Sequence, residues 1–108
     1  MPIPHIEAMD FDWGWRWLRG EKKIEICNDS RDTIFIRLLT MPPSKDLPFS
    51  RWRDLLLLEG NMYSGESAAH HIDEDQVFVI LSYKGKAAEY HNLCNPFILE
   101  KGHRVRIT

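Results

Sequence analysis

The chain has 108 residues, of which 44% are hydrophobic and 28% charged, and its formal net charge is −2. This length is most simply one domain with one core, and the composition is ordinary for a soluble globular protein. The charge gives no indication of nucleic-acid binding, and no apolar run approaches the ~20 residues needed to cross a membrane. The N-terminus lacks the basic and apolar regions of a signal peptide. We therefore expect a cytoplasmic protein.

The two cysteines, Cys27 and Cys94, stand among apolar residues and belong to no CxxC pair. Their surroundings favour buried free thiols in a reducing compartment. A disulfide between them stays open, because spacing alone does not establish pairing.

The chain is predicted to consist of an extended lead-in, residues 1–10, and a single domain, residues 11–108. Pro2 and Pro4 favour extended backbone in the lead-in. Trp13, Trp15 and Trp17 then alternate with other residues, which predicts a strand with three indoles on one face. Such a face is either part of the core or an aromatic interaction surface. We expect this segment to be an edge strand and the protein to be a homodimer.

Alternation and short apolar runs predict most of the other strands, with Val105 and Ile107 facing inward. Residues 28–32 have turn chemistry, and residues 41–48 form a proline-rich loop. Residues 49–59 are either strand or short helix, with strand favoured. Residues 61–75 are predicted as a long polar connection. The strands are expected at residues 23–28, 33–40, 76–83, 87–93, 96–99 and 103–108.

Seven or eight short strands with at most one short helix indicate an all-β fold. The expected architecture for this pattern is a small barrel or a sandwich. No internal repeat or low-complexity segment is present.

A candidate site precedes the strongest predicted strand. In residues 65–75, GESAAHHIDED, a glycine comes before a histidine pair and carboxylates. Together with the apolar–turn–apolar segment at residues 97–105, this order resembles the cupin family over roughly the C-terminal half. Fragments at residues 25–27, 48–50 and 57–60 look similar to the HutD/Ves group of cupin-like proteins. The resemblance implies a jelly-roll barrel.

The histidines depart from the metal-binding pattern of that family. Metal-binding cupins typically space the first two histidines by one residue, whereas His70 and His71 are adjacent. Adjacent strand residues point to opposite faces, so both reach one metal only if a bulge or loop turns them together. Imidazole and carboxylate suit iron, manganese, nickel or zinc. One hypothesis is therefore a divalent transition metal held by His70, His71 and Glu74; the other is an exposed polar loop. The spacing does not require His91 or His103 as a further ligand.

Two aromatic residues, Trp52 and Tyr63, are further candidates for ligand binding. Trp52 lies between Arg51 and Arg53 and is expected to be partly exposed. Tyr63 would add an aromatic wall and a hydroxyl beside the histidines. Because ligands enter small barrels where long loops leave them, we expect entry beside residues 61–75.

Two functions are compatible with these features. The first is a non-catalytic module on a cupin-like barrel that binds a small molecule or a protein partner. The second is a small metal-dependent cupin-type enzyme that uses His70, His71 and Glu74. The sequence has neither a glycine-rich phosphate loop nor a GxSxG nucleophile elbow.

Overall fold

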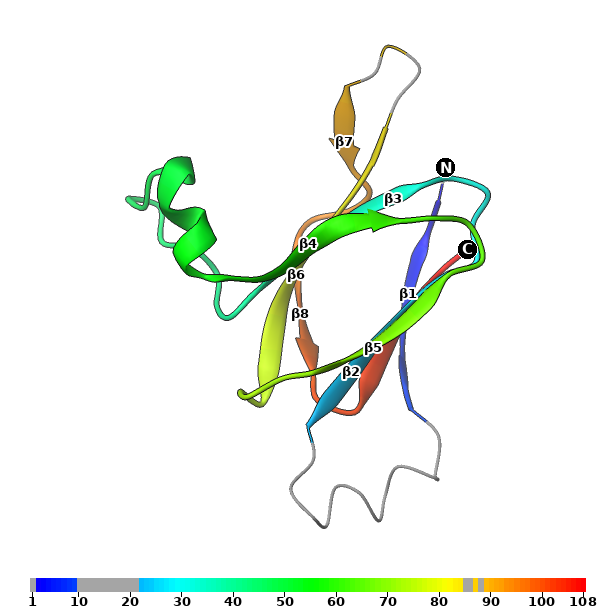
Figure 1. The fold of residues 1–108 in the computed structure, drawn as a ribbon, viewed down its shortest axis with the longest axis horizontal. Coiled ribbons are helices and arrows are strands. Elements are labelled where there is room, and N and C mark those ends of the chain that lie inside the picture. The colour runs from blue at the N-terminus through cyan, green and yellow to red at the C-terminus, as the bar shows by residue number, and fades with distance from the viewer. Residues whose placement is uncertain (1, 10–21, 85–86, 88) are drawn as a thin grey trace.

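The computed structural model describes residues 2–9, 22–84, 87 and 89–108, and it is an all-β fold of two sheets (Figure 1). The predicted all-β class is confirmed in its sandwich form. The described strands form two sheets that do not close into a barrel, so the barrel alternative is wrong. Among the described residues, no helix is both long and apolar enough to span a membrane.

Sheet A has four strands in the order β1, β9, β2 and β5. The strand β9 runs antiparallel to β1 and parallel to β2, and β2 runs antiparallel to β5. The bounds are β1 (Pro4–Ala8), β9 (His103–Ile107), β2 (Lys23–Asn28) and β5 (Ser67–His71). The predicted N-terminal lead-in is thus extended, but it pairs along β1 as part of sheet A.

Sheet B has five strands, with β3 and β6 at its centre. The strand β3 pairs with β4 on one side and β6 on the other, and β7 and β8 pair with opposite ends of β6. The bounds are β3 (Ile34–Leu39), β4 (Leu56–Met62), β6 (Gln76–Lys84), β7 (Tyr90–Asn92) and β8 (Phe97–Glu100).

The core lies between the sheets and follows strand alternation. On β6, Val77, Val79 and Leu81 face inward and are fully or almost fully buried. On β9, Val105 and Ile107 face inward, as predicted, and their neighbours Arg104 and Arg106 face outward. Further core residues are Ile24, Ile26, Ile34, Ile36, Leu38, Met62, Ile72, Leu93 and Leu99.

Two of the predicted segments differ from the structure. Residues 49–59 are not one element: the 3₁₀-helix η2 (Phe49–Asp54) comes first, and β4 follows it and continues to Met62. Pro48 fixes the backbone before η2, and the N–H of Arg51 donates to its carbonyl at 2.9 Å. The predicted long connection at residues 61–75 is also wrong, because residues 67–71 form β5.

The tryptophan stripe of Trp13, Trp15 and Trp17 lies outside the described residues. The homodimer that we predicted from it therefore stays a prediction. Cys27 and Cys94 are both free thiols, as favoured by the sequence, with Cys27 buried and Cys94 half-buried.

Candidate functional site

The predicted metal ligands do not come together in the structure. His70 and His71 are on the regular strand β5, where His70 pairs with Ile24 and His71 with Lys23 of β2. They therefore point to opposite faces of sheet A. Glu74 is exposed in the turn after β5. Among the described residues, no group of three or more His, Cys, Asp or Glu side chains is placed to hold a metal ion.

His70 faces the inside of the sandwich. Its Nε2 atom is buried and has no hydrogen-bond partner among the described residues. Burial lowers the pKa of this imidazole below 6.5. The folded protein thus favours neutral His70. As the pH falls below 6.5, the unfolded state binds a proton at this residue more readily than the folded state, so the free energy of unfolding decreases.

Tyr63 begins the turn that connects β4 to β5. Tyr63 is exposed, and the N–H of Glu66 donates to its carbonyl at 3.0 Å across a turn. Gly65 has φ 85°, in the left-handed region that glycine adopts readily. Because the sheets form a sandwich, the predicted barrel mouth beside these residues does not exist.

Asn28 lies beside the turn between β4 and β5, at the end of β2, and its side chain is fully buried. Its Nδ2 donates to the carbonyls of Asp32 and Met62 at 2.8 and 2.9 Å. Its Oδ1 accepts from Ser30 N and Oγ at 3.1 and 2.6 Å. This side chain links the turn after β2 to the end of β4. The sequence predicted a turn here, but not the long-range bond to Met62.

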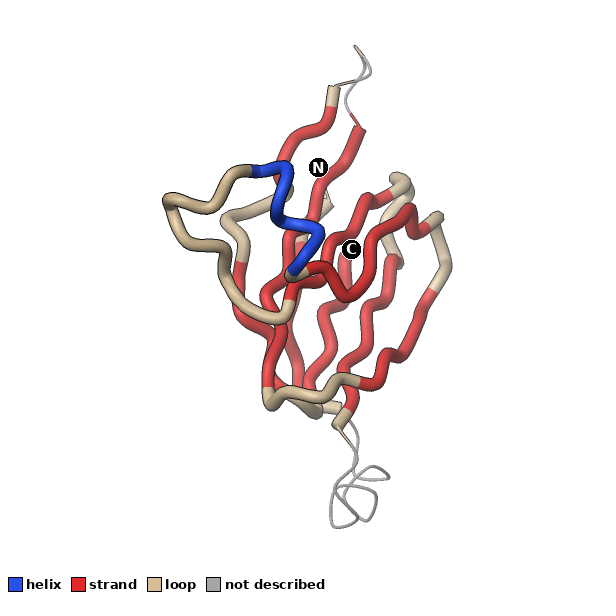
Figure 2. Tube along the Cα trace, turned by 60° about the vertical axis from the view of Figure 1, so that its left-hand side comes forward, coloured by secondary structure: helices blue, strands red, loops and turns tan. Residues whose placement is uncertain are grey.

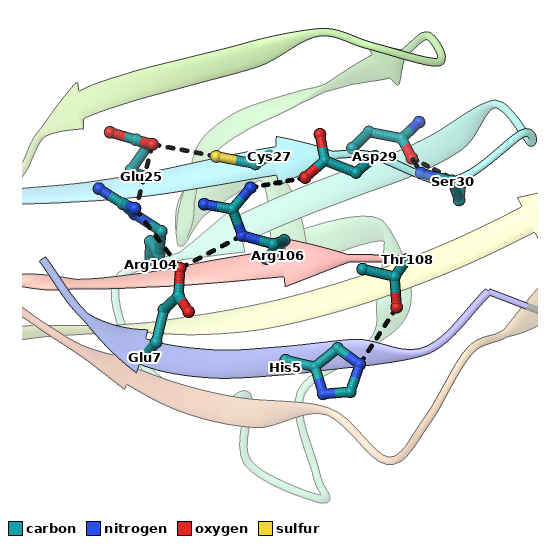
Figure 3. Close-up of polar contacts among 10 residues, drawn as sticks. His5, Glu7, Glu25, Cys27, Asp29, Ser30, Arg104, Arg106 and Thr108 are labelled. Atoms are coloured by element: carbon teal, nitrogen blue, oxygen red, sulfur yellow. Dashed lines mark hydrogen bonds and ion pairs between the residues drawn. The ribbon is translucent and has the colours of Figure 1, made fainter.

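Charged side chains form a ladder across the outer face of sheet A (Figure 3). Arg106 joins Asp29 at 2.6 Å and Glu7 at 3.3 Å. Arg104 joins Glu7 and Glu25, each at 3.4 Å. Acids and bases alternate from β1 through β9 to β2, so these charges are mutually paired. Such pairing is typical of a solvated sheet face rather than a binding site.

Cys27 is covered by this ladder and is only 5% exposed. Its Sγ–H donates to Glu25 Oε1 at 3.0 Å. Burial and then this hydrogen bond raise the pKa of the thiol from 9.0 to about 11. The thiol is therefore protonated near neutral pH and is a poor nucleophile.

The raised pKa of Cys27 predicts a loss of stability in alkali. Stability from the protonated thiol is complete below pH 9.0 and disappears as the pH rises to about 11. A shift of this size corresponds to about 3 kcal/mol. Cys27→Ser retains a donor for Glu25 but does not titrate, so its free energy of unfolding should fall less between pH 9.0 and about 11. Urea denaturation across this range measures the difference.

Cys94→Ala is the matched control for this experiment, because it removes a thiol but leaves Cys27 in place. It should retain the alkaline loss that comes from Cys27. If wild type and Cys27→Ser lose stability in parallel, the thiol at position 27 does not have the raised pKa.

A groove on the outer face of sheet B is the strongest candidate for a binding site. It lies between η2 and the ends of β3 and β4 and has a volume of about 230 Å³. Figures 1 and 2 show η2 and its flanking loops as an arm that projects beside the strands. The groove is lined by Arg37, Leu39, Phe49, Ser50, Trp52, Arg53, Leu56 and Glu59.

Trp52 is the one predicted ligand-binding residue that lines this groove. It is half-buried, as expected, and its indole N–H donates to the Leu47 carbonyl at 3.4 Å. The ring centroids of Trp52 and Phe49 are 5.0 Å apart and the rings are tilted by 48°. Phe49 is 65% exposed, which is unusual for so large an apolar ring. The two rings give the arm an aromatic face that is open to a ligand.

Arg37 places a positive charge beside these rings. Its guanidinium carbon lies 5.0 Å from the ring centroid of Phe35 and 5.5 Å from that of Phe49. Both distances are within the range of cation–π attraction. The Arg37 Nε is 3.8 Å from Glu59 Oε2. The groove thus combines apolar contact area with a positioned cation.

Sequence reasoning missed Arg37, Phe49 and Glu59. The available signal was the alternation of Phe35 and Arg37 within an otherwise apolar strand, which places both on the outer face. Comparisons with protein-family models, with curated proteins and with solved structures find no match to this chain.

Proposed function

We propose that this protein is a non-catalytic binding module that holds a small molecule in the groove between η2 and sheet B. The observation that carries the proposal is the pairing of an exposed ring, Phe49, and a half-buried ring, Trp52, with a half-buried arginine in one concavity. Ligand sites commonly combine apolar walls with a few placed polar groups. The volume of about 230 Å³ is slightly below the usual lower bound of ~300 Å³, which favours a ligand with a single ring or a short chain.

The groove residues supply contact and charge more readily than catalysis. Among the described lining residues, Ser50 is the only one with a hydroxyl, and it makes no hydrogen bond to a described His, Asp or Glu. A serine nucleophile requires such a base within reach. The proposal therefore concerns binding alone.

Trp52→Ala should weaken binding of one-ring compounds about tenfold, because the mutation removes a wall of the groove. The probes are phenylacetate, phenylacetamide and benzylamine, added to uniformly ¹⁵N-labelled protein. We expect dissociation constants on the order of 0.1–1 mM for the best of them. Amide chemical shifts should change at Arg37, Phe49, Trp52 and their neighbours.

Tyr63→Ala is the matched control, because Tyr63 is an exposed aromatic residue outside the groove. It should bind the probes as wild type does. The proposal fails if no probe shifts the groove resonances at millimolar concentration. It also fails if the shifts map to another face.

A further inference from the structure

We infer that the ligand of this groove is a small monocarboxylate with an apolar ring or chain, and that Arg37 binds its carboxylate in competition with Glu59. This inference rests on the proposed function and specifies the ligand class. It follows from the setting of the Arg37 guanidinium, the charge of the groove and the apolar residues around them.

The guanidinium of Arg37 is oriented by its neighbours. It lies on β3 opposite Glu59 of β4, and the rings of Phe35 and Phe49 lie within 5.5 Å of its central carbon. Phe35 is on the same strand as Arg37 and Phe49 is on the arm, so the cation is held from two elements. Arginine stacked in this way keeps its planar set of N–H donors available for an acceptor.

Those donors have no hydrogen-bond acceptor in the described part of the chain. The nearest acid, Glu59 Oε2, is 3.8 Å from Arg37 Nε, which is too long for a hydrogen bond. The Arg37 side chain is also only 29% exposed, so water reaches it incompletely. A carboxylate in the groove can accept two parallel hydrogen bonds from the guanidinium and replace a weak ion pair with a stronger one.

The charge of the groove favours an anion with one negative charge. Arg37 and Arg53 line the groove together with one acid, Glu59. In η2, Arg51 pairs with Asp54 at 3.3 Å, whereas Arg53 has no ion pair among the described residues. Two cations and one anion leave a net charge of +1. A monocarboxylate would bring the net charge of the groove to zero, whereas a phosphate dianion would leave an excess negative charge beside Glu59.

The rest of the ligand meets apolar side chains. On the side of sheet B the lining includes the buried Leu39 of β3 and the half-buried Leu56 of β4, and Phe49 and Trp52 belong to the arm. A ring or short chain attached to the carboxylate would cover the exposed parts of Phe49, Trp52 and Leu56 and remove them from water. The two parts of the groove thus match the two parts of an amphipathic acid.

The test compares phenylacetate with phenylacetamide, which have the same ring but differ in charge. Wild type should bind phenylacetate at least about tenfold more tightly, as expected for charge-assisted hydrogen bonds. Arg37→Gln should remove this preference while retaining weak binding of both compounds. Glu59→Gln should tighten phenylacetate binding about three- to tenfold, because it removes the competitor for Arg37.

Arg37→Lys provides a second variant if Arg37→Gln does not fold. It retains the charge but loses the planar donor set, so the preference for the acid should fall several-fold. Asp54→Asn is the control for Glu59→Gln, since it removes an acid from the arm that does not line the groove. It should leave phenylacetate binding unchanged.

Each contrary result has a distinct meaning. Equal affinity for acid and amide overturns this inference but leaves the binding module standing. Phenyl phosphate binding more tightly than phenylacetate also overturns it. An increase in affinity in Asp54→Asn as large as that in Glu59→Gln assigns the effect to general charge and overturns the role of Glu59. Failure of every probe to reach the groove refutes the proposed function itself.

Discussion

Val79→Asp should strongly destabilise this protein and lower its melting temperature. Val79 is fully buried in the middle of β6, paired with Leu38 of β3 and Phe97 of β8. An aspartate there would place a carboxylate without a partner in the core, at a cost of at least about 4 kcal/mol. Domains of this size have a free energy of unfolding of roughly 5–15 kcal/mol, so the substitution removes a large share of the total stability. Thermal unfolding followed by circular dichroism measures the loss.

Leu57→Asp is the matched control, because Leu57 lies at the bulge of the edge strand β4 and is 47% exposed. The same kind of substitution there should change the free energy of unfolding by less than about 1 kcal/mol. An unchanged melting temperature in Val79→Asp would show that β6 is wrongly placed in the core.

Asn28→Ala should destabilise the protein by about 2–4 kcal/mol. The mutation removes two donors and one acceptor from a fully buried site. The carbonyls of Asp32 and Met62 and the N–H and hydroxyl of Ser30 would lose their hydrogen bonds to this side chain. Urea denaturation gives the change in the free energy of unfolding.

Asn61→Ala is the comparison for this prediction. Asn61 is exposed on β4, one residue before Met62, and should contribute less than about 0.5 kcal/mol. Equal effects of the two substitutions would mean that the hydrogen bonds of Asn28 add nothing to the net stability.

The strands that the sequence predicted well are those whose local pattern agrees with their tertiary setting. The apolar run at residues 76–83 became β6, and the turn at Gly102, with φ 79°, connects β8 to β9 where predicted. Here alternation, turn chemistry and burial all favour the same structure. Alternation and turn chemistry depend on neighbours in sequence, so the sequence alone predicts these elements.

The strand β5 could not be predicted from its own residues. Residues 67–71, SAAHH, have weak strand propensity and look like a polar connection. They form a strand because β2 supplies a full register of partners, from Cys27 opposite Ser67 to Lys23 opposite His71. That pairing also separates the two histidines, which the sequence alone could not show.

The groove was beyond prediction for a related reason. Its lining comes from β3, η2 and β4, and Arg37 is separated in sequence from Phe49 and Glu59. Trp52 was identified from its charged neighbours, but its partners depend on how the arm folds back beside sheet B. Only the assembled sheet brings Arg37 to the rings of the arm.

The position of β9 between β1 and β2 has a consequence for the folding rate. Ile3 and Thr108 exchange two backbone hydrogen bonds of 2.9 Å, and β1 pairs only with β9 among the described strands. Completing sheet A thus requires contacts between the two ends of the sequence, and the entropy of closing that loop is lost before these contacts compensate for it. Sheet B needs only residues 34–100, so it can form first and serve as the surface on which β2, β5 and β9 assemble. We expect slow folding, on a timescale of milliseconds to seconds, with formation of sheet A as the slow step.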